Sequence, residues 1–225
     1  LNESEDIIEY FYSLPVKIKK EIRINNPKHL SDIYNTMAAT YAYLQKTDKM
    51  YEVAKKALNE IKKYSKGADR NSNLFEAYHQ VILASIGSNN LNETVYYLNQ
   101  SKNVATQLVN SPEGVSTIAG IVSFQLPTII NAGLYAEAED LVNFIDDFLK
   151  FDSLGIIERF QEDVFNYSLG RLNLIKKDYT KAIYHFELAS LHYLEKPGAG
   201  IYNMYSALAN LLLLEAYMGN KDPVR

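Results

Sequence analysis

Four similar turn sequences recur along the chain and divide it into segments of nearly equal length. They read TDKMYEVA, SNNLNETV, NAGLYAEAE and IKKDYTKAI. When they are aligned, one position always holds an apolar residue, and successive copies lie 41, 44 and 44 residues apart: Met50, Leu91, Tyr135 and Tyr179. The position three residues later holds Val53, Thr94, Ala138 and Ala182. A recurring period of this length is typical of stacked repeats, here with one helix hairpin per repeat.

The segments between the turns carry apolar residues at three- and four-residue spacing, and strict alternation is rare, which predicts an all-α fold. Asn26 before Pro27 and Ser111 before Pro112 are typical helix starts, because proline's missing N–H costs nothing in the first turn. Pro127 is expected to kink its helix. The predicted helices cover 4–14, 16–24, 27–45, 49–66, 73–87, 90–109, 112–131, 134–151, 156–176, 178–195 and 199–218.

We expect these helices to form a single domain over residues 1–225. An N-terminal helical cap is expected at 1–24 and a terminal first helix at 199–218. Between them, four helix hairpins are expected at 27–66, 73–109, 112–151 and 156–195.

Two alanines lie seven residues apart in the segment KKDYTKAIYHFELA, between large apolar side chains. We expect Ala182 to lie at the contact within its hairpin and Ala189 at the contact with the next one, with Gly170 as the matching small residue on the first helix. Small side chains let helix backbones approach closely while larger neighbours fill the grooves. These neighbours are Tyr179, Ile183 and Phe186.

The stretch YSLGRLNLIKKDYTKAIYHFELA resembles a tetratricopeptide repeat. The family's signature positions are matched by Leu169, Gly170, Tyr179, Ala182, Phe186 and Ala189, and in the preceding repeat by Gly133, Tyr135 and Ala138. The chain departs from the family at Asn166 and Asn173, where aromatics are usual, and its spacing exceeds the typical ~34 residues. The resemblance implies a right-handed α-α superhelix (a solenoid) that acts as a non-catalytic scaffold and binds a protein or peptide in a concave groove.

The groove residues are projected from the stripe of each first helix that faces away from its own partner helix. In the fourth repeat this stripe holds Tyr167, Arg171 and Leu174, at i, i+4 and i+7. The corresponding polar candidates are Asn35, Glu76, His79, Gln80 and Asn210. Arg171 is the strongest candidate, because a guanidinium can hold a carboxylate with two parallel hydrogen bonds. Most of the 18 tyrosines are expected to fill the core.

No arrangement in the sequence indicates catalysis or metal binding. His185 and His192 are seven residues apart, which separates their backbones by ~10 Å along a helix. The other histidines are His29 and His79. The acidic pairs Glu158/Glu162 and Asp146/Asp147 have no nucleophile, phosphate loop or G-x-S-x-G sequence nearby. We therefore expect a protein that is not an enzyme and has neither metal nor cofactor.

Charge and composition exclude other classes of function. Residues 1–70 carry 13 Lys and Arg against 10 Asp and Glu, and residues 71–225 carry 10 against 17, too mild a contrast for nucleic-acid binding. The basic stretch VKIKKEIR is typical of a solvated edge helix. The longest apolar run, ALANLLLLEAYM, falls short of the ~20 residues of a membrane span. The absence of cysteine is compatible with a reducing cytosol, and we expect a cytoplasmic location.

Two hypotheses of function follow. The first is a protein- or peptide-binding module that uses the concave groove. The alternative is a peptide-sensing domain of a larger bacterial regulator, because arrays with long, irregular repeats resemble those of bacterial peptide-responsive regulators. The chain lacks an initiator methionine and ends abruptly, so we expect a piece of a longer protein under the second hypothesis.

Overall fold

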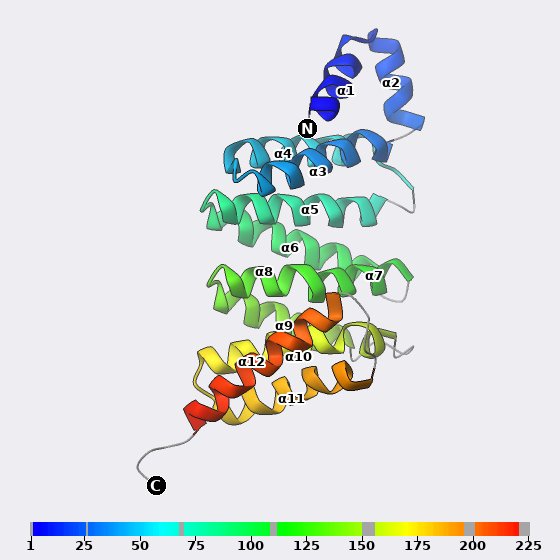
Figure 1. Ribbon diagram of the computed structural model, residues 1–225. Coiled ribbons are helices and arrows are strands. Elements are labelled where there is room, and N and C mark those ends of the chain that lie inside the picture. The colour runs from blue at the N-terminus through cyan, green and yellow to red at the C-terminus, as the bar shows by residue number, and fades with distance from the viewer. Residues whose placement is uncertain are drawn as a thin grey trace. The chain divides into compact units, whose positions relative to one another are not determined.

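The computed structural model describes residues 2–25, 27–67, 70–108, 112–149, 156–195 and 201–220. Helices and short turns make up all of this described part, which contains no strand, so the predicted all-α class is confirmed (Figure 1). The chain divides into two compact units, unit 1 at Leu1–Leu108 and unit 2 at Val109–Arg225.

Unit 1 contains six helices within its described residues. They are α1 (Asn2–Ser13), α2 (Val16–Asn25), α3 (Pro27–Tyr43), α4 (Thr47–Tyr64), α5 (Arg70–Gly87) and α6 (Leu91–Gln107). The described helices of unit 2 are α7 (Pro112–Gly120), the π-helical turn η1 (Ile121–Gln125), α8 (Leu126–Asn131), α9 (Tyr135–Leu149), α10 (Ile156–Ile175), α11 (Tyr179–Glu195) and α12 (Ile201–Asn220).

The four hairpin turns repeat with a uniform period. The helices after the turns begin at Thr47, Leu91, Tyr135 and Tyr179, so each begins 44 residues after the one before. Every turn holds one residue with φ between 54° and 76°, again at a spacing of 44: Gln45, Asn89, Gly133 and Lys177. The next residue donates its backbone N–H to the carbonyl five residues back, as from Asn90 to Ser85 (2.7 Å). This bond ends the first helix in the manner of a Schellman motif.

This turn geometry corrects the sequence alignment of the first repeat by three residues. Thr47, rather than Met50, is equivalent to Leu91, and Met50 is equivalent to Thr94. The alignment had matched apolar residues, whereas the hydrogen bonds of the turn fix the register. Threonine occupies a position that is apolar in the other three repeats.

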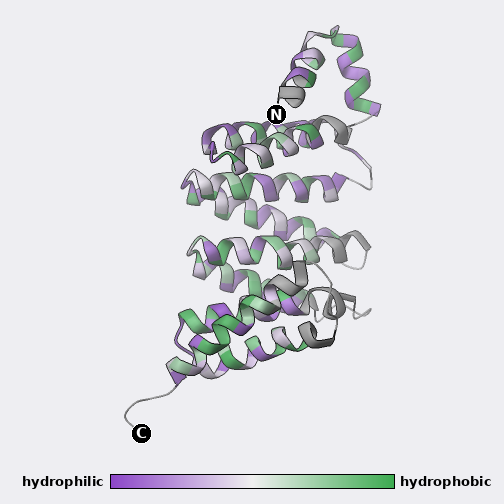
Figure 2. Ribbon diagram, in the orientation of Figure 1, coloured by the Kyte–Doolittle hydropathy of each residue, from purple (hydrophilic) through white to green (hydrophobic). Residues whose placement is uncertain are grey.

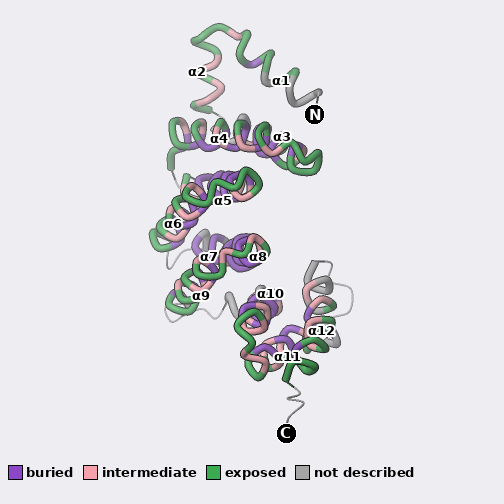
Figure 3. The backbone as a smooth tube through the Cα atoms, turned by 90° about the vertical axis from the view of Figure 1, so that its left-hand side faces the viewer, coloured by how far each residue is buried: buried purple, intermediate pink, exposed green. Residues whose placement is uncertain are grey.

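Unit 1 consists of two packed hairpins and a helical cap. Helices α3 and α4 pair, α5 and α6 pair, and α5 contacts both α3 and α4. Figure 3 shows α3 and α5 on one side of this unit and α4 and α6 on the other. The cap, α1 and α2, contacts α3, and Arg23 of α2 reaches Glu60 of α4 with two hydrogen bonds of 2.7 and 2.8 Å. Helix α2 is otherwise mostly exposed, as predicted for an edge helix.

The first helix of unit 2 is interrupted immediately before Pro127. Residues Ile121–Gln125 form a π-helical turn, in which the N–H of Leu126 donates to the carbonyl of Ile121. The proline ring would clash with the carbonyl four residues back in a regular α-helix, and the wider turn relieves this conflict. Pro127 itself is buried. The predicted irregularity at Pro127 therefore takes the form of a π turn.

Small residues bring α10, α11 and α12 together in unit 2. One buried cluster contains two alanine pairs, each seven residues apart and each wholly buried: Ala182 and Ala189 of α11, and Ala209 and Ala216 of α12. Tyr167 of α10 and Phe186 of α11 complete it. Figure 2 shows how apolar α12 is along much of its length. The spacing of the α11 alanines thus reflects close packing, with α12 contributing a matching pair.

Gly170 of α10 permits the approach of α11. A Cβ atom at this position would lie 2.5 Å from the ring of Phe186, which is fully buried. This contact is shorter than van der Waals packing allows, and a buried ring cannot move aside without disturbing its neighbours. The expected role of Gly170 as the small partner in this hairpin is therefore supported by its geometry.

We predict that Gly170→Ala lowers the free energy of unfolding by about 1–3 kcal/mol, even though alanine is the better helix former. Chemical denaturation followed by circular dichroism measures the change. The double variant Gly170→Ala/Phe186→Leu should be less destabilised than the sum of its two single variants, because the smaller side chain relieves the overlap. Stabilisation by Gly170→Ala would contradict the close approach.

Candidate peptide-binding surface

The candidates of unit 1 lie on α3 and α5, two first helices in contact. Asn35 and His79 are 44 residues apart and so occupy the same position of the repeat. Asn35 is buried, and its Oδ1 accepts no hydrogen bond from the described residues. Burial lowers the pKa of the half-buried His79 to about 4, so this imidazole is neutral at neutral pH. Glu76 is exposed and Gln80 is half-buried, which makes both accessible from solvent.

Two candidates of unit 2, Tyr167 and Arg171, lie next to each other on α10. The Cζ atom of Arg171 lies 5.8 Å from the ring centroid of Tyr167, and its Nη1 donates a hydrogen bond to Oδ1 of Asn131 at the end of α8. Tyr167 is buried, and its ring centroid lies 5.2 Å from that of Tyr205 on α12. Helix α10 contacts both α8 and α12, which places these groups together. We call Asn131, Tyr167, Arg171 and Tyr205 the Arg171 surface.

The remaining unit 2 candidates are Leu174 on α10 and Asn210 on α12. Leu174 is half-buried and packs against the alanine cluster, and Asn210 is exposed on α12. Burial and the neighbouring Tyr167 raise the pKa of Tyr205, while Arg171 opposes this shift. Asn131 and Tyr205 were not singled out as site residues from the sequence, because they come from helices 40 and 34 residues away from Arg171. Only the packing of α8 and α12 against α10 brings them to it.

Arg171 has no carboxylate partner among the described residues. In this part of the chain its guanidinium donates a hydrogen bond to a neutral amide and lies over the ring of Tyr167, and its charge also acts on the nearby Tyr205. Because Arg171 is half-buried, water solvates its guanidinium less fully than a surface charge. A guanidinium in this setting can bind a carboxylate with two parallel hydrogen bonds, and the half-buried ring of Tyr205 provides apolar surface nearby.

The other groups considered from the sequence have structural contacts or lie outside the described side chains. Nδ1 of His185 lies 3.0 Å from Oδ1 of Asn166 within the α10–α11 hairpin. Asp146 and Asp147 are exposed on α9. Within the described residues, no three potential metal ligands gather. The structure does not describe the side chains of His29, His192, Glu158 and Glu162.

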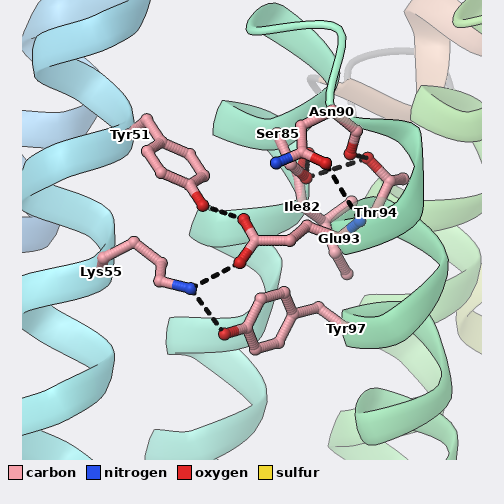
Figure 4. A network of polar contacts seen from close by, with 8 residues as sticks. All are labelled: Tyr51, Lys55, Ile82, Ser85, Asn90, Glu93, Thr94 and Tyr97. Atoms are coloured by element: carbon pink, nitrogen blue, oxygen red, sulfur yellow. Dashed lines mark hydrogen bonds and ion pairs between the residues drawn. The ribbon is translucent and has the colours of Figure 1, made fainter.

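The second helices of unit 1 are joined by a polar network, shown in Figure 4. Lys55 of α4 donates to Glu93 of α6 (2.7 Å) and to the hydroxyl of Tyr97 (2.9 Å), and Tyr51 donates to the other oxygen of Glu93. Burial raises the pKa of Glu93, but the hydrogen bonds from Lys55 and Tyr51 outweigh it, so the pKa lies below its ordinary value. The fold therefore favours the ionised carboxylate.

A second group of contacts orders the turn between α5 and α6. Asn90 accepts a hydrogen bond from the N–H of Glu93 and so caps α6. Ser85 and Thr94, both fully buried, lie 2.9 Å apart between their hydroxyl oxygens. Thr94 occupies the repeat position that holds Ala138 and Ala182 elsewhere, so the bond to Ser85 satisfies a hydroxyl at a close helix contact.

We predict that Glu93→Gln lowers the free energy of unfolding at pH 7 by about 1 kcal/mol. A carboxylate with a depressed pKa stabilises the fold above its unfolded pKa of ~4.3, and this stability is lost as the pH falls through the folded value. The difference between wild type and variant should therefore shrink on acidification from pH 7 to about pH 3. Urea denaturation across this range measures it.

Glu52→Gln is the matched control, because Glu52 also pairs with a lysine on α4. Its pair with Lys56 is exposed, with side-chain exposures of 49% for Lys56 and 63% for Glu52. Exposed pairs at this spacing contribute only about 0.3–0.5 kcal/mol. If the two substitutions lowered the free energy of unfolding equally at pH 7, the stabilising role of the Glu93 network would be contradicted.

Comparisons with protein-family models, with curated proteins and with solved structures find no match to this chain. Among the helices that the structure describes, none combines the length and the apolar character that crossing a membrane requires.

Proposed function

We propose that this chain is a non-catalytic helical-repeat module that binds a protein or peptide segment at the Arg171 surface. The observation that carries the proposal is the half-buried Arg171 guanidinium, which lacks a carboxylate partner among the described residues and faces the amide of Asn131 and the ring of Tyr167. A peptide carboxylate fits Arg171, because it would form two charge-assisted hydrogen bonds while a neighbouring apolar side chain of the peptide packs on the half-buried ring of Tyr205.

We further propose that the hairpins stack into a right-handed superhelix. The uniform 44-residue period supports this arrangement, since repeats of equal length and equal turn geometry join in equal ways. Contacts within each unit agree with it: α3 contacts α5, and α10 contacts both α8 and α12, so first helices lie beside first helices. Such a row of helices presents a continuous surface to an extended ligand.

Small-angle scattering tests the superhelix. A compact globule of 225 residues has a radius of gyration of ~17 Å, and a stacked array should exceed this value clearly. The measurement requires a monomeric sample, checked by light scattering. A radius of gyration at the globular value would contradict the stacked array.

Selection from a random peptide library, followed by fluorescence anisotropy of the enriched peptides, tests the binding surface. We expect enriched peptides to contain Asp or Glu and to bind Arg171→Glu at least about tenfold more weakly than wild type, because a like charge replaces the partner of the carboxylate. The melting temperature of the variant should fall by no more than a few degrees, since Arg171 makes no ion pair with a described residue that the substitution would break.

Lys177→Glu serves as the control for the change of charge. Lys177 is exposed in the turn at the end of α10 and lies outside the Arg171 surface, so this variant should bind the enriched peptides as wild type does. Unchanged affinity of Arg171→Glu together with a large loss of thermal stability would show that Arg171 is structural, and would overturn the proposal.

A further inference from the structure

Unit 1 contains a cavity at the end of its hairpins where α4, α5 and α6 meet. Its volume is about 580 Å³, within the range of ~300–1,000 Å³ that is usual for small-ligand sites. Its lining comprises Lys62 from α4, Arg70, Asn71, Leu74 and Tyr78 from α5, and Gln100, Asn103, Val104, Thr106 and Gln107 from α6. The cavity is lined by residues of unit 1 and the Arg171 surface belongs to unit 2, so the two share no residue.

The described residues of the lining include two cations and no acidic residue. Neither Lys62 nor Arg70 makes an ion pair with a described residue. Nζ of Lys62 lies 5.6 Å from the ring centroid of Tyr78 and 5.7 Å from that of Tyr97, so aromatic faces are its neighbours here. Among the residues that the structure describes, no carboxylate balances these two charges, and this excess of positive charge attracts an anion.

The neighbouring polar network does not supply a carboxylate to Lys62. Tyr97 contacts both Lys62 and Lys55, but Glu93 is already bound to Lys55 and to Tyr51. Burial lowers the pKa of Lys62, and repulsion from Lys55 adds to this effect. A bound anion would oppose both effects, because its negative charge favours the protonated ammonium group.

The rest of the lining indicates what the anion is attached to. Four side chains carry a primary amide, which offers both a donor and an acceptor and so matches the alternating N–H and C=O groups of a peptide backbone: Asn71, Gln100, Asn103 and Gln107. Leu74 and Val104 are buried and provide an apolar floor. A bare inorganic anion would use the cations but would leave the amides and the floor unmatched.

We propose that this cavity binds a short peptide, with Lys62 and Arg70 holding a carboxylate and the amide side chains holding its backbone. The carboxylate belongs either to the peptide's C-terminus or to an Asp or Glu side chain. This inference does not rest on the Arg171 surface, because every lining residue belongs to unit 1.

Titration of the full chain with four peptides, followed by NMR of the side-chain amides, tests the proposal. The probes are acetyl-Ala-Leu-Glu and acetyl-Ala-Leu-Gln, each with a free and with an amidated C-terminus. We expect the three probes with a carboxylate to shift the amide signals of Asn71 and Asn103. The neutral probe should bind at least about tenfold more weakly, and added salt should weaken only the charged probes. The tighter of the two singly charged probes identifies the source of the carboxylate.

Variants and inorganic phosphate complete the test. Lys62→Gln and Arg70→Gln should each weaken binding of the charged probes about fivefold or more, while Lys66→Gln, which removes an exposed lysine outside the cavity, should not. Circular dichroism melts verify that each variant is folded, and Arg171→Glu should retain binding here. Four outcomes would each overturn the proposal. The neutral probe could bind as tightly as the charged probes, or both cavity variants could keep the wild-type affinity. Phosphate could bind as tightly as the peptides, or the amide signals could fail to shift at about 10 mM probe.

Discussion

The close approach of helix backbones through residues with little or no side chain is the constraint on which unit 2 depends. Gly170 leaves room for the ring of Phe186, and four wholly buried alanines line the contact between α11 and α12. Because α12 packs closely, the ring centroid of Tyr205 lies 5.2 Å from that of Tyr167, and the groups around Arg171 form one surface. A larger side chain at any of these small positions would separate the helices and disperse that surface.

Local chemistry made the fold predictable, and its limits explain the error in the first repeat. Helix periodicity and capping residues are properties of short segments, so the helices and the position of the irregularity at Pro127 followed from the sequence. The alignment of the first repeat at Thr47 could not be predicted in this way, because it is fixed by backbone hydrogen bonds around a residue in the left-handed conformation. Gln45 and Lys177 adopt the left-handed conformation although they are not glycine, so the residue type at these positions did not predict it.

The candidate site was predictable only in part, since facing a groove and being accessible are different properties. Projection around a helix grouped Arg171 with Tyr167 on a stripe facing away from α11, but the ring of Tyr167 packs against Phe186 of α11 and Tyr205 of α12. Asn35 is buried in the same way at the equivalent position of the repeat. Neighbouring helices decide burial, and their approach depends on small residues far away in the sequence. The contribution of Asn131 to the Arg171 surface could not be seen for the same reason.

Some cations of the chain form ion pairs that join helices, whereas others have no acidic partner among the described residues. Arg23 binds Glu60 and Lys55 binds Glu93, and each pair joins two helices of unit 1. Arg171, Lys62 and Arg70 make no such pair with the described residues, although the chain carries 27 acidic residues against 23 basic ones. A shortage of carboxylates therefore does not explain their isolation. A cation beside aromatic rings, as Arg171 and Lys62 are, loses part of its hydration, and a ligand carboxylate would compensate for this loss. The same electrostatic reasoning thus supports both proposed sites, while their different neighbours give them different ligands: an extended segment at the Arg171 surface, and a short peptide in the cavity of unit 1.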